Sequence, residues 1–291
     1  MKQRMLIMLA AAALLASAAA PTAALLASAA APTAAAAPNP VPISAEAAAL
    51  IDVESGRLLY SHNGDKRMRI ASLTKIMTAI VAIESGDLSD IVKTSRRAAG
   101  KEGSSIYLRV GEEMSLHNLL YGLMLRSGND AAVAIAEHVG GSEEGFVHLM
   151  NEKARELGLE NTHFMNPHGL DHDDHYSSAN DLAKLTAYAL RNPVFREIVK
   201  TRVKKVPNPY AEWDHIWINK NKMLRLYEGA DGVKTGYTKL AHRCLVSSAT
   251  RNGQQLAVVT LNDGDDWADH RRLLDWGFQH YPLQTIVEEG R

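Results

Sequence analysis

The sequence predicts an α+β fold in which one antiparallel sheet is built from both ends of the chain. Strand-like segments occur near the start and again near the end, whereas the middle carries apolar residues at helical spacing. This order is typical of a sheet with helices packed on it and a helical subdomain inserted into it. We expect a functional site in the groove between the two parts.

The composition is that of an ordinary globular protein. The chain has 291 residues, of which 46% are hydrophobic and 22% are charged, so it can form a sizeable core. A formal net charge of −1 gives no reason to expect nucleic acid as a partner. The single cysteine, Cys244, excludes an internal disulfide, and its apolar, strand-like surroundings favour a packing role.

Residues 1–37 have the layout of a secretory signal peptide. A short basic start precedes an apolar run rich in Leu and Ala, and then a run of small residues. Residues 13–23 are repeated letter for letter at 24–34, as expected of slippage in low-complexity sequence. An uncleaved membrane anchor is the alternative, which the prolines and many alanines weaken. We therefore expect an exported protein with a Pro-rich linker at 38–43 and one folded domain at 44–291.

The first elements of the folded domain are a hairpin and a helix. Residues 47–53 indicate a strand, 54–57 a turn, and 58–61 the returning strand. The next helix starts with Ser72 at its N-cap or in its first turn and ends at Ser85-Gly86.

The middle of the chain alternates short strands with several helices. Ser127-Gly128-Asn129-Asp130 interrupts the helical pattern, and Asp130 is the expected N-cap of the helix that follows. The predicted elements are short strands around 91–92 and 106–108, and helices from 115, over 131–139, from the Ser142 cap to 157, and over 180–190.

Strand character returns near Trp217 and continues almost to the end. Three strands are predicted at 232–235, 243–250 and 255–261, and Arg251-Asn252-Gly253 joins the last two as a hairpin turn. A closing helix is predicted over 267–278.

Ser72-Leu73-Thr74-Lys75 is the first motif with chemical potential. Residues three apart lie on one face of a helix, so Lys75 would sit beside Ser72. A partly desolvated lysine can remove the proton of a serine hydroxyl and make it a nucleophile. Taken alone, the motif favours a capped surface helix with a solvated lysine, because Ser-x-x-Lys is expected about once by chance in a chain of this length.

Two further motifs change this balance. Ser127-Gly128-Asn129 places polar side chains inside a packed helical region, although it could simply be a turn between helices. Lys234-Thr235-Gly236 lies on a predicted strand, where Lys234 and Gly236 would point to one side and Thr235 to the other. A glycine there lets a ligand backbone approach closely, whereas the alternative is an edge strand with a solubilising lysine.

Together these motifs resemble those of the low-molecular-mass penicillin-binding proteins, the serine-type D-alanyl-D-alanine carboxypeptidases. The resemblance covers about residues 44–282. It implies a β-lactamase/transpeptidase-like fold and an enzyme of cell-wall biogenesis that removes the terminal D-alanine from peptidoglycan stem pentapeptides. It also implies acylation by β-lactams and no cofactor, metal or obligate protein partner.

The resemblance carries roles onto individual residues. Ser72 would form the acyl-enzyme, Lys75 would take its proton, and Ser127 would relay a proton towards the departing D-alanine. Asn129 would hold either the substrate backbone or Lys75. The remaining expected substrate-binding residues are Lys234 and Thr235 for the terminal carboxylate, Gly236, and Tyr237, whose backbone N–H would join that of Ser72 in the oxyanion hole.

Three alternatives differ in their chemistry. A class A β-lactamase shares the motifs but needs a glutamate-held water, and the family-like stretch 161–180 contains no glutamate. An idle wall-binding protein would be expected to have lost a motif. A metal-dependent wall peptidase could use the cluster His163, His168, Asp171, His172, Asp173, Asp174 and His175, which however lacks the His-x-x-x-His spacing of a helical zinc site.

The end of the chain and two stretches of its sequence lead to two finer expectations. Many relatives continue into a β-rich domain and a membrane-docking helix, for which this sequence leaves no room after 282. The stretches 121–141 and 233–239 look closest to the sporulation-type carboxypeptidases that trim spore cortex.

Overall fold

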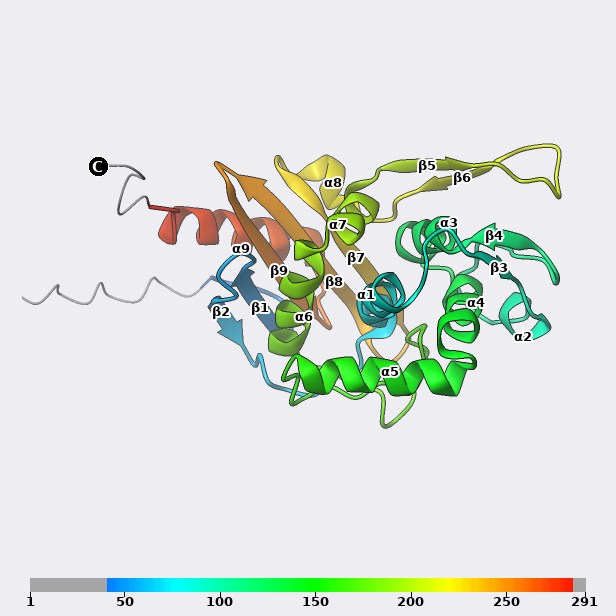
Figure 1. Cartoon of the computed structure of the whole chain (residues 1–291). Coiled ribbons are helices and arrows are strands. Elements are labelled where there is room, and N and C mark those ends of the chain that lie inside the picture. The colour runs from blue at the N-terminus through cyan, green and yellow to red at the C-terminus, as the bar shows by residue number, and fades with distance from the viewer. Residues whose placement is uncertain (1–40, 285–291) are drawn as a thin grey trace, which may run out of the picture. The chain divides into compact units, whose positions relative to one another are not determined.

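The structure, a computed structural model, describes residues 41–284, and its centre is a five-stranded antiparallel sheet (Figure 1). The strand order is β2-β1-β9-β8-β7, so strands from both ends of the described region lie side by side. The predicted fold class is therefore confirmed. The strands are β1 (Ala47–Asp52), β2 (Leu58–His62), β7 (Ala230–Thr238), β8 (His242–Arg251) and β9 (Gln254–Leu261).

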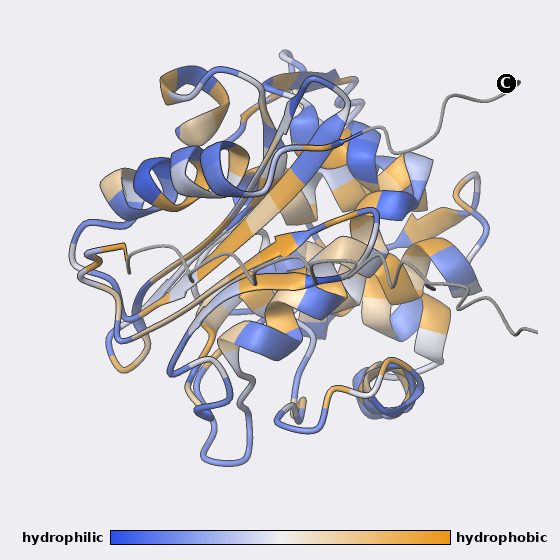
Figure 2. Ribbon diagram, turned by 90° about the vertical axis from the view of Figure 1, so that its left-hand side faces the viewer, coloured by the Kyte–Doolittle hydropathy of each residue, from blue (hydrophilic) through white to orange (hydrophobic). Residues whose placement is uncertain are grey.

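The two faces of the sheet bury different cores because side chains alternate along each strand. In β1, Ala49 and Ile51 face the large core under the helices, whereas Ala48 and Leu50 face helix α9 (Asp266–His280). Figure 2 shows the hydrophobic colour concentrated on the strands of the sheet and on the helices that cover it. The sheet is thus a layer between α9 and the helical part.

The helical part is inserted between β2 and β7, as predicted. The central helix of this part, over Lys75–Ser85, is buried along most of its length, as expected from its nearly continuous apolar sequence. The elements are η1 (Ala71–Thr74, a 3₁₀ helix), α1 (Lys75–Ser85), β3 (Ile91–Lys93), α2 (Arg96–Ala99), β4 (Glu113–Ser115), α3 (Leu116–Tyr121), η2 (Gly122–Arg126, a π-helix), α4 (Asn129–Gly140), α5 (Glu143–Glu156), α6 (Ala179–Arg191), α7 (Pro193–Lys200), β5 (Val203–Val206), β6 (His215–Ile218) and α8 (Met223–Leu226).

Two local predictions were wrong, and one side chain explains both. Asp130 does not cap the following helix, because Gly128 takes the N-cap position of α4. The Asp130 carboxylate instead accepts hydrogen bonds at 3.1 Å from the backbone N–H groups of Ile106 and Leu108. Residues 106–108 therefore form a loop around a buried carboxylate instead of the predicted strand.

The predicted signal peptide at 1–37 lies outside the described residues. Of the predicted linker, Val41 is buried and Ile43 is partly buried, and both pack in the core beneath α9. No helix within residues 41–284 combines the length and the apolar character needed to cross a bilayer.

Candidate active site

Ser72 and Lys75 lie side by side at the start of the central helix, as their spacing predicts. Ser72 is in the first turn, within η1, and Lys75 is the first residue of α1. The Lys75 side chain is fully buried, and its Nζ donates to Ser72 Oγ at 3.0 Å. The same Nζ donates to Asn129 Oδ1 at 2.8 Å and to the backbone oxygen of His168 at 2.6 Å. These three acceptors fix the Lys75 nitrogen beside the serine hydroxyl.

The environment of Lys75 favours its neutral form. Burial lowers the pKa of Lys75 well below its usual value, and the positive charges of Lys234 and Lys220 lower it further. The carboxylate of Asp130 opposes this effect. A lysine with a depressed pKa can act as a general base towards the serine beside it.

Ser127 and Asn129 occupy the junction between two helices. The π-helix η2 ends at Arg126, and Ser127 follows as its C-cap with a left-handed backbone, φ of 66°. This sharp change of direction aims the Ser127 hydroxyl towards Lys234, whose Nζ donates to it at 3.0 Å. Asn129 takes the second of its two expected roles, since it accepts from Lys75 and donates through Nδ2 to the Glu102 carbonyl at 2.7 Å.

Lys234 lies on β7, the edge strand of the sheet, but it is not a solubilising surface lysine. Lys234 is only 2% exposed, and its Nζ donates to Ser127 Oγ and to the Thr235 carbonyl. Burial lowers the pKa of Lys234 to about 7, with a further contribution from Lys220. The alternative in which Lys234 is a solubilising lysine on an edge strand is therefore wrong.

Two glycines permit close backbone approaches around Ser72. A side-chain Cβ at Gly236 would lie 3.2 Å from the backbone nitrogen of Ser72, so β7 passes directly against the helix start. Gly169, with φ of +87°, packs so tightly that a Cβ there would overlap the Ala71 carbonyl. The positions of Ser72 and of the backbone near Tyr237 thus depend on both glycines.

A cavity of about 500 Å³ opens over these groups. The predicted residues Ser72, Ser127, Thr235, Gly236 and Tyr237 line it, whereas Lys75, Asn129 and Lys234 lie buried behind its wall. Tyr237 is 65% exposed. Cys244, for which a packing role was expected, also lines the cavity, together with residues that no motif marks: Ser104, Lys220, Arg243, Asp266 and Trp267.

The unpredicted residues add positive charge to the cavity. Lys220 is exposed at the edge of the cavity, and its Nζ donates to Ser104 Oγ at 3.3 Å. Arg243 holds a two-point contact with Asp266, at 2.6 and 3.1 Å. Buried Cys244, whose thiol pKa burial raises to about 12, contributes packing. Because Asp266 neutralises Arg243, the charge of Lys220 is the one that can attract a carboxylate ligand to this edge of the cavity.

The His-Asp cluster at 163–175 does not converge on a common point in the structure. His168 Nε2 lies 3.2 Å from Glu143, His175 Nε2 lies 2.8 Å from the Thr74 hydroxyl, and burial lowers the pKa of each histidine, to about 4 and about 3. Asp171 accepts from Thr238, and Asp173 pairs with Arg69. Within residues 41–284, no group of three or more His, Cys, Asp or Glu side chains is arranged to hold a metal ion.

The fold, and the three motifs that meet at one cavity, are those of the penicillin-binding class of proteins. Comparison with known families agrees, since the profile described as D-alanyl-D-alanine carboxypeptidase matches residues 32–265. The chain belongs to this family.

Individual relatives extend the similarity over most of the chain. D-alanyl-D-alanine carboxypeptidase DacF of Bacillus subtilis is 38% identical over 263 residues, which cover 85% of this chain and 65% of the relative. DacA of Escherichia coli is 35% identical over 86% of this chain and 64% of its own length. The chain thus spans slightly less than two thirds of these curated relatives. A D-alanyl-D-alanine carboxypeptidase of a Streptomyces species is 33% identical over 81% of this chain and 88% of its own length.

Solved structures show the same fold. A D-alanyl-D-alanine carboxypeptidase from Mycobacterium tuberculosis matches with a TM-score of 0.80 and 31% identity, over 86% of this chain and 97% of that one. A Streptomyces DD-transpeptidase variant matches with a TM-score of 0.78 and 33% identity, over 82% of this chain and 99% of that one.

Proposed function

We propose that this protein is a serine D-alanyl-D-alanine carboxypeptidase that removes the terminal D-alanine from peptidoglycan stem pentapeptides through an acyl-enzyme. The observation that carries the proposal is the buried Lys75, whose Nζ lies 3.0 Å from Ser72 Oγ and whose pKa is strongly lowered. Family membership supports the substrate class.

Acylation begins when neutral Lys75 takes the Ser72 hydroxyl proton as Oγ attacks the carbonyl carbon of the penultimate D-alanine. The backbone N–H groups of Ser72 and Tyr237 stabilise the oxyanion. The C–N bond then breaks, and the proton that Lys75 took from Ser72 passes through the Ser127 hydroxyl to the leaving amine, which leaves Lys75 neutral again. Water completes the cycle by hydrolysing the ester, with Lys75 again as the base.

Substrate binding uses the positive edge of the cavity. Lys234 and Thr235 hold the terminal carboxylate, whose charge raises the protonated fraction of Lys234 above that of the free site. Gly236 lets the edge strand β7 pass close to Ser72, and the substrate backbone can lie along the free edge of β7. Asn129 keeps Lys75 aimed at Ser72.

The same proposal sets the cellular context. A peptidoglycan substrate requires an exported enzyme at the cell wall or the outer face of the membrane, and β-lactams would acylate Ser72 as substrate analogues. The similarity to the sporulation type suggests trimming of spore cortex, and normal sporulation of a deletion strain would contradict that finer role.

D-alanine release from a synthetic pentapeptide ending in D-Ala-D-Ala tests the activity. We expect release by the wild type and a loss of at least about a thousandfold for Ser72→Ala, because the nucleophile is removed. A pentapeptide ending in D-Ala-L-Ala is the matched substrate control. Full activity of Ser72→Ala, or activity abolished by a chelator, would contradict the serine mechanism and favour the metal-dependent alternative. Rapid penicillin hydrolysis without D-alanine release would favour the β-lactamase.

A further inference from the structure

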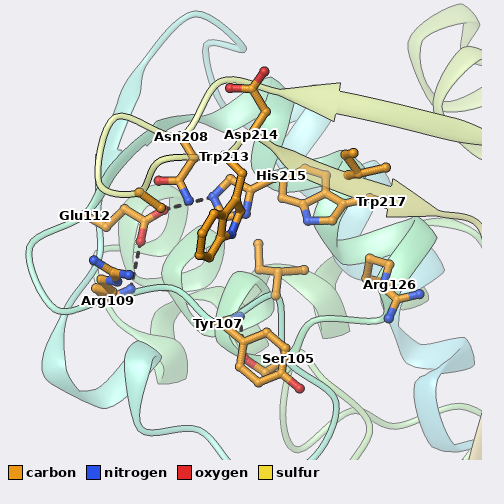
Figure 3. Close-up of a pocket in the computed structure, with 13 residues that line it drawn as sticks. Ser105, Tyr107, Arg109, Glu112, Arg126, Asn208, Trp213, Asp214, His215 and Trp217 are labelled. Carbon is orange, nitrogen blue, oxygen red and sulfur yellow. Dashed lines mark hydrogen bonds and ion pairs between the residues drawn. The ribbon is translucent and has the colours of Figure 1, made fainter.

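A second cavity, of about 330 Å³, lies near the active-site cavity. Figure 3 shows the residues that line it. The two cavities share a wall through neighbouring residues: Ser104 and Ser127 line the first, whereas Ser105 and Arg126 line the second. A substrate bound at Ser72 could therefore extend into the second cavity. None of the motifs accounts for this cavity.

Two exposed aromatic residues face the second cavity from different elements. Tyr107 lies on the loop before β4 and is 83% exposed, and Trp213 lies on the loop between β5 and β6 and is 72% exposed. Figure 3 shows them on opposite sides of the cavity. Exposed aromatic side chains that line a cavity are typical of ligand-binding surfaces.

The opposing arrangement of these rings is built into the structure. Arg109 Nη1 donates to the Tyr210 carbonyl at 2.7 Å, and the backbone N–H of Glu113 donates to the Tyr210 hydroxyl at 3.1 Å. These contacts tie the loop of Trp213 to the loop of Tyr107. Ser105 Oγ in turn accepts from the Tyr107 backbone N–H at 2.8 Å.

The charged lining residues balance, two arginines against two carboxylates, which favours a ligand without a large net charge. Both carboxylates already have partners. Glu112 accepts from the backbone N–H of Arg109 and lies 3.4 Å from His215 Nε2. Asp214 pairs with Lys205 at 3.0 Å. Arg126 Nη1 donates to the Ile218 carbonyl at 3.3 Å, which leaves the guanidinium further N–H groups for ligand oxygens.

Aromatic faces together with fixed hydrogen-bond donors suit a sugar ring, which has an apolar face and a rim of hydroxyl and amide groups. We propose that this cavity binds an N-acetylated amino sugar of the peptidoglycan glycan strand. The inference rests on the proposed function, because it makes the glycan a second recognition element of the same substrate. Four residues of stem peptide separate the sugar from the scissile carbonyl, and an extended peptide of that length spans up to about 14 Å.

The test compares D-alanine release from a disaccharide-pentapeptide with release from the same pentapeptide without sugars. We expect wild-type kcat/KM to be higher for the disaccharide-pentapeptide. Trp213→Ala should lower the ratio of the two kcat/KM values about three- to tenfold, Trp213→Phe should retain most of it, and Leu226→Ala, an exposed apolar control on α8, should not change it. An unchanged ratio in Trp213→Ala would overturn the inference, and so would an equal loss on both substrates, which would indicate peptide binding.

A second readout separates this inference from the proposed function. If the wild type releases no D-alanine from either substrate, the proposed activity fails, and direct sugar binding then decides the inference. Titration with β-1,4-linked N-acetylglucosamine disaccharide should give a saturable change in tryptophan fluorescence in the wild type that Trp213→Ala lacks. No saturable change in the wild type would overturn the sugar site.

Discussion

At the level of single residues, the charge state of Lys75 depends on a lysine that no motif marks. Lys220 lines the active-site cavity, and its charge lowers the pKa values of both Lys75 and Lys234. Its position is fixed by its backbone N–H, which donates to the Leu125 carbonyl at 3.1 Å. Lys220 therefore acts on the site through its charge, while its own side chain bonds to Ser104.

Removal of the Lys220 charge should shift the pH dependence of acylation. In Lys220→Gln the pKa of Lys75 rises, more of Lys75 is protonated at a given pH, and the acidic limb of the acylation rate moves to higher pH. At pH 7 the rate should fall about two- to fivefold. Stopped-flow acylation by a chromogenic β-lactam between pH 5 and 9 measures the limb. The exposed Lys239→Gln is the charge-matched control, and identical profiles for both variants would refute the role of Lys220.

Single residues also mark the limit of prediction from the sequence. Ser72, Lys75, Ser127, Asn129 and Lys234 were predictable because each belongs to a short motif. Lys220 and Arg243 reach the cavity only through the fold, from the segment after β6 and from the start of β8, and no local spacing signals them.

At the level of elements, the loop that contains Gly169 supports the start of the catalytic helix. The His168 carbonyl accepts from Lys75, the Pro167 carbonyl accepts from the Thr78 hydroxyl at 2.6 Å, and Gly169 packs on the Ala71 carbonyl. The loop thus contacts η1 and α1 from behind the nucleophile. Its histidines and aspartates made a metal site one alternative, but it is the backbone carbonyls of this loop that hold the start of α1.

Gly169→Ala should therefore damage both stability and acylation. The added methyl group overlaps the Ala71 carbonyl at a position that also has φ of +87°, so the turn with Ser72 must shift. We expect acylation to slow by about a hundredfold and the free energy of unfolding to fall by about 2 kcal/mol or more. Gly158→Ala is the matched control, since Gly158 also has positive φ but nothing within 4 Å of its would-be Cβ. Equal acylation by the two variants would count against the supporting role of the loop.

Elements with a clear hydrophobic period were predictable, whereas those set by tertiary contacts were not. The hairpin of β8 and β9 follows from Asn252-Gly253, both of which adopt positive φ. Residues 106–108 are of types common in strands, but the Asp130 carboxylate takes the N–H groups that a strand would pair. The helix α7 was not predicted, although Asn192 caps it in front of Pro193 at N1.

At the level of the whole molecule, three buried histidines make the fold sensitive to acid. Burial lowers the pKa values of His168, His175 and His270 to about 4, 3 and 3, respectively. His270 lies between the Ser247 and Thr260 hydroxyls in the core of the sheet. Each histidine stays neutral in the folded state but protonates on unfolding below about pH 6.5.

Stability should therefore fall as the pH decreases from about 6.5 towards 4, because the unfolded state binds more protons in that window. Between pH 7 and pH 5 each histidine should contribute a loss of about 2 kcal/mol. Urea denaturation at the two pH values measures the loss, and His270→Gln should reduce it by about one third relative to the exposed control His148→Gln. A pH dependence unchanged by His270→Gln would contradict this account.

The central claim is that Ser72 is the nucleophile of a penicillin-sensitive acyl-transfer enzyme. Intact-mass measurement after incubation with benzylpenicillin, followed by peptide mapping, tests it most directly. We predict one long-lived adduct per chain, located on Ser72 and absent from Ser72→Ala. An adduct on another residue, or no adduct and no hydrolysis with folded protein, would contradict the claim.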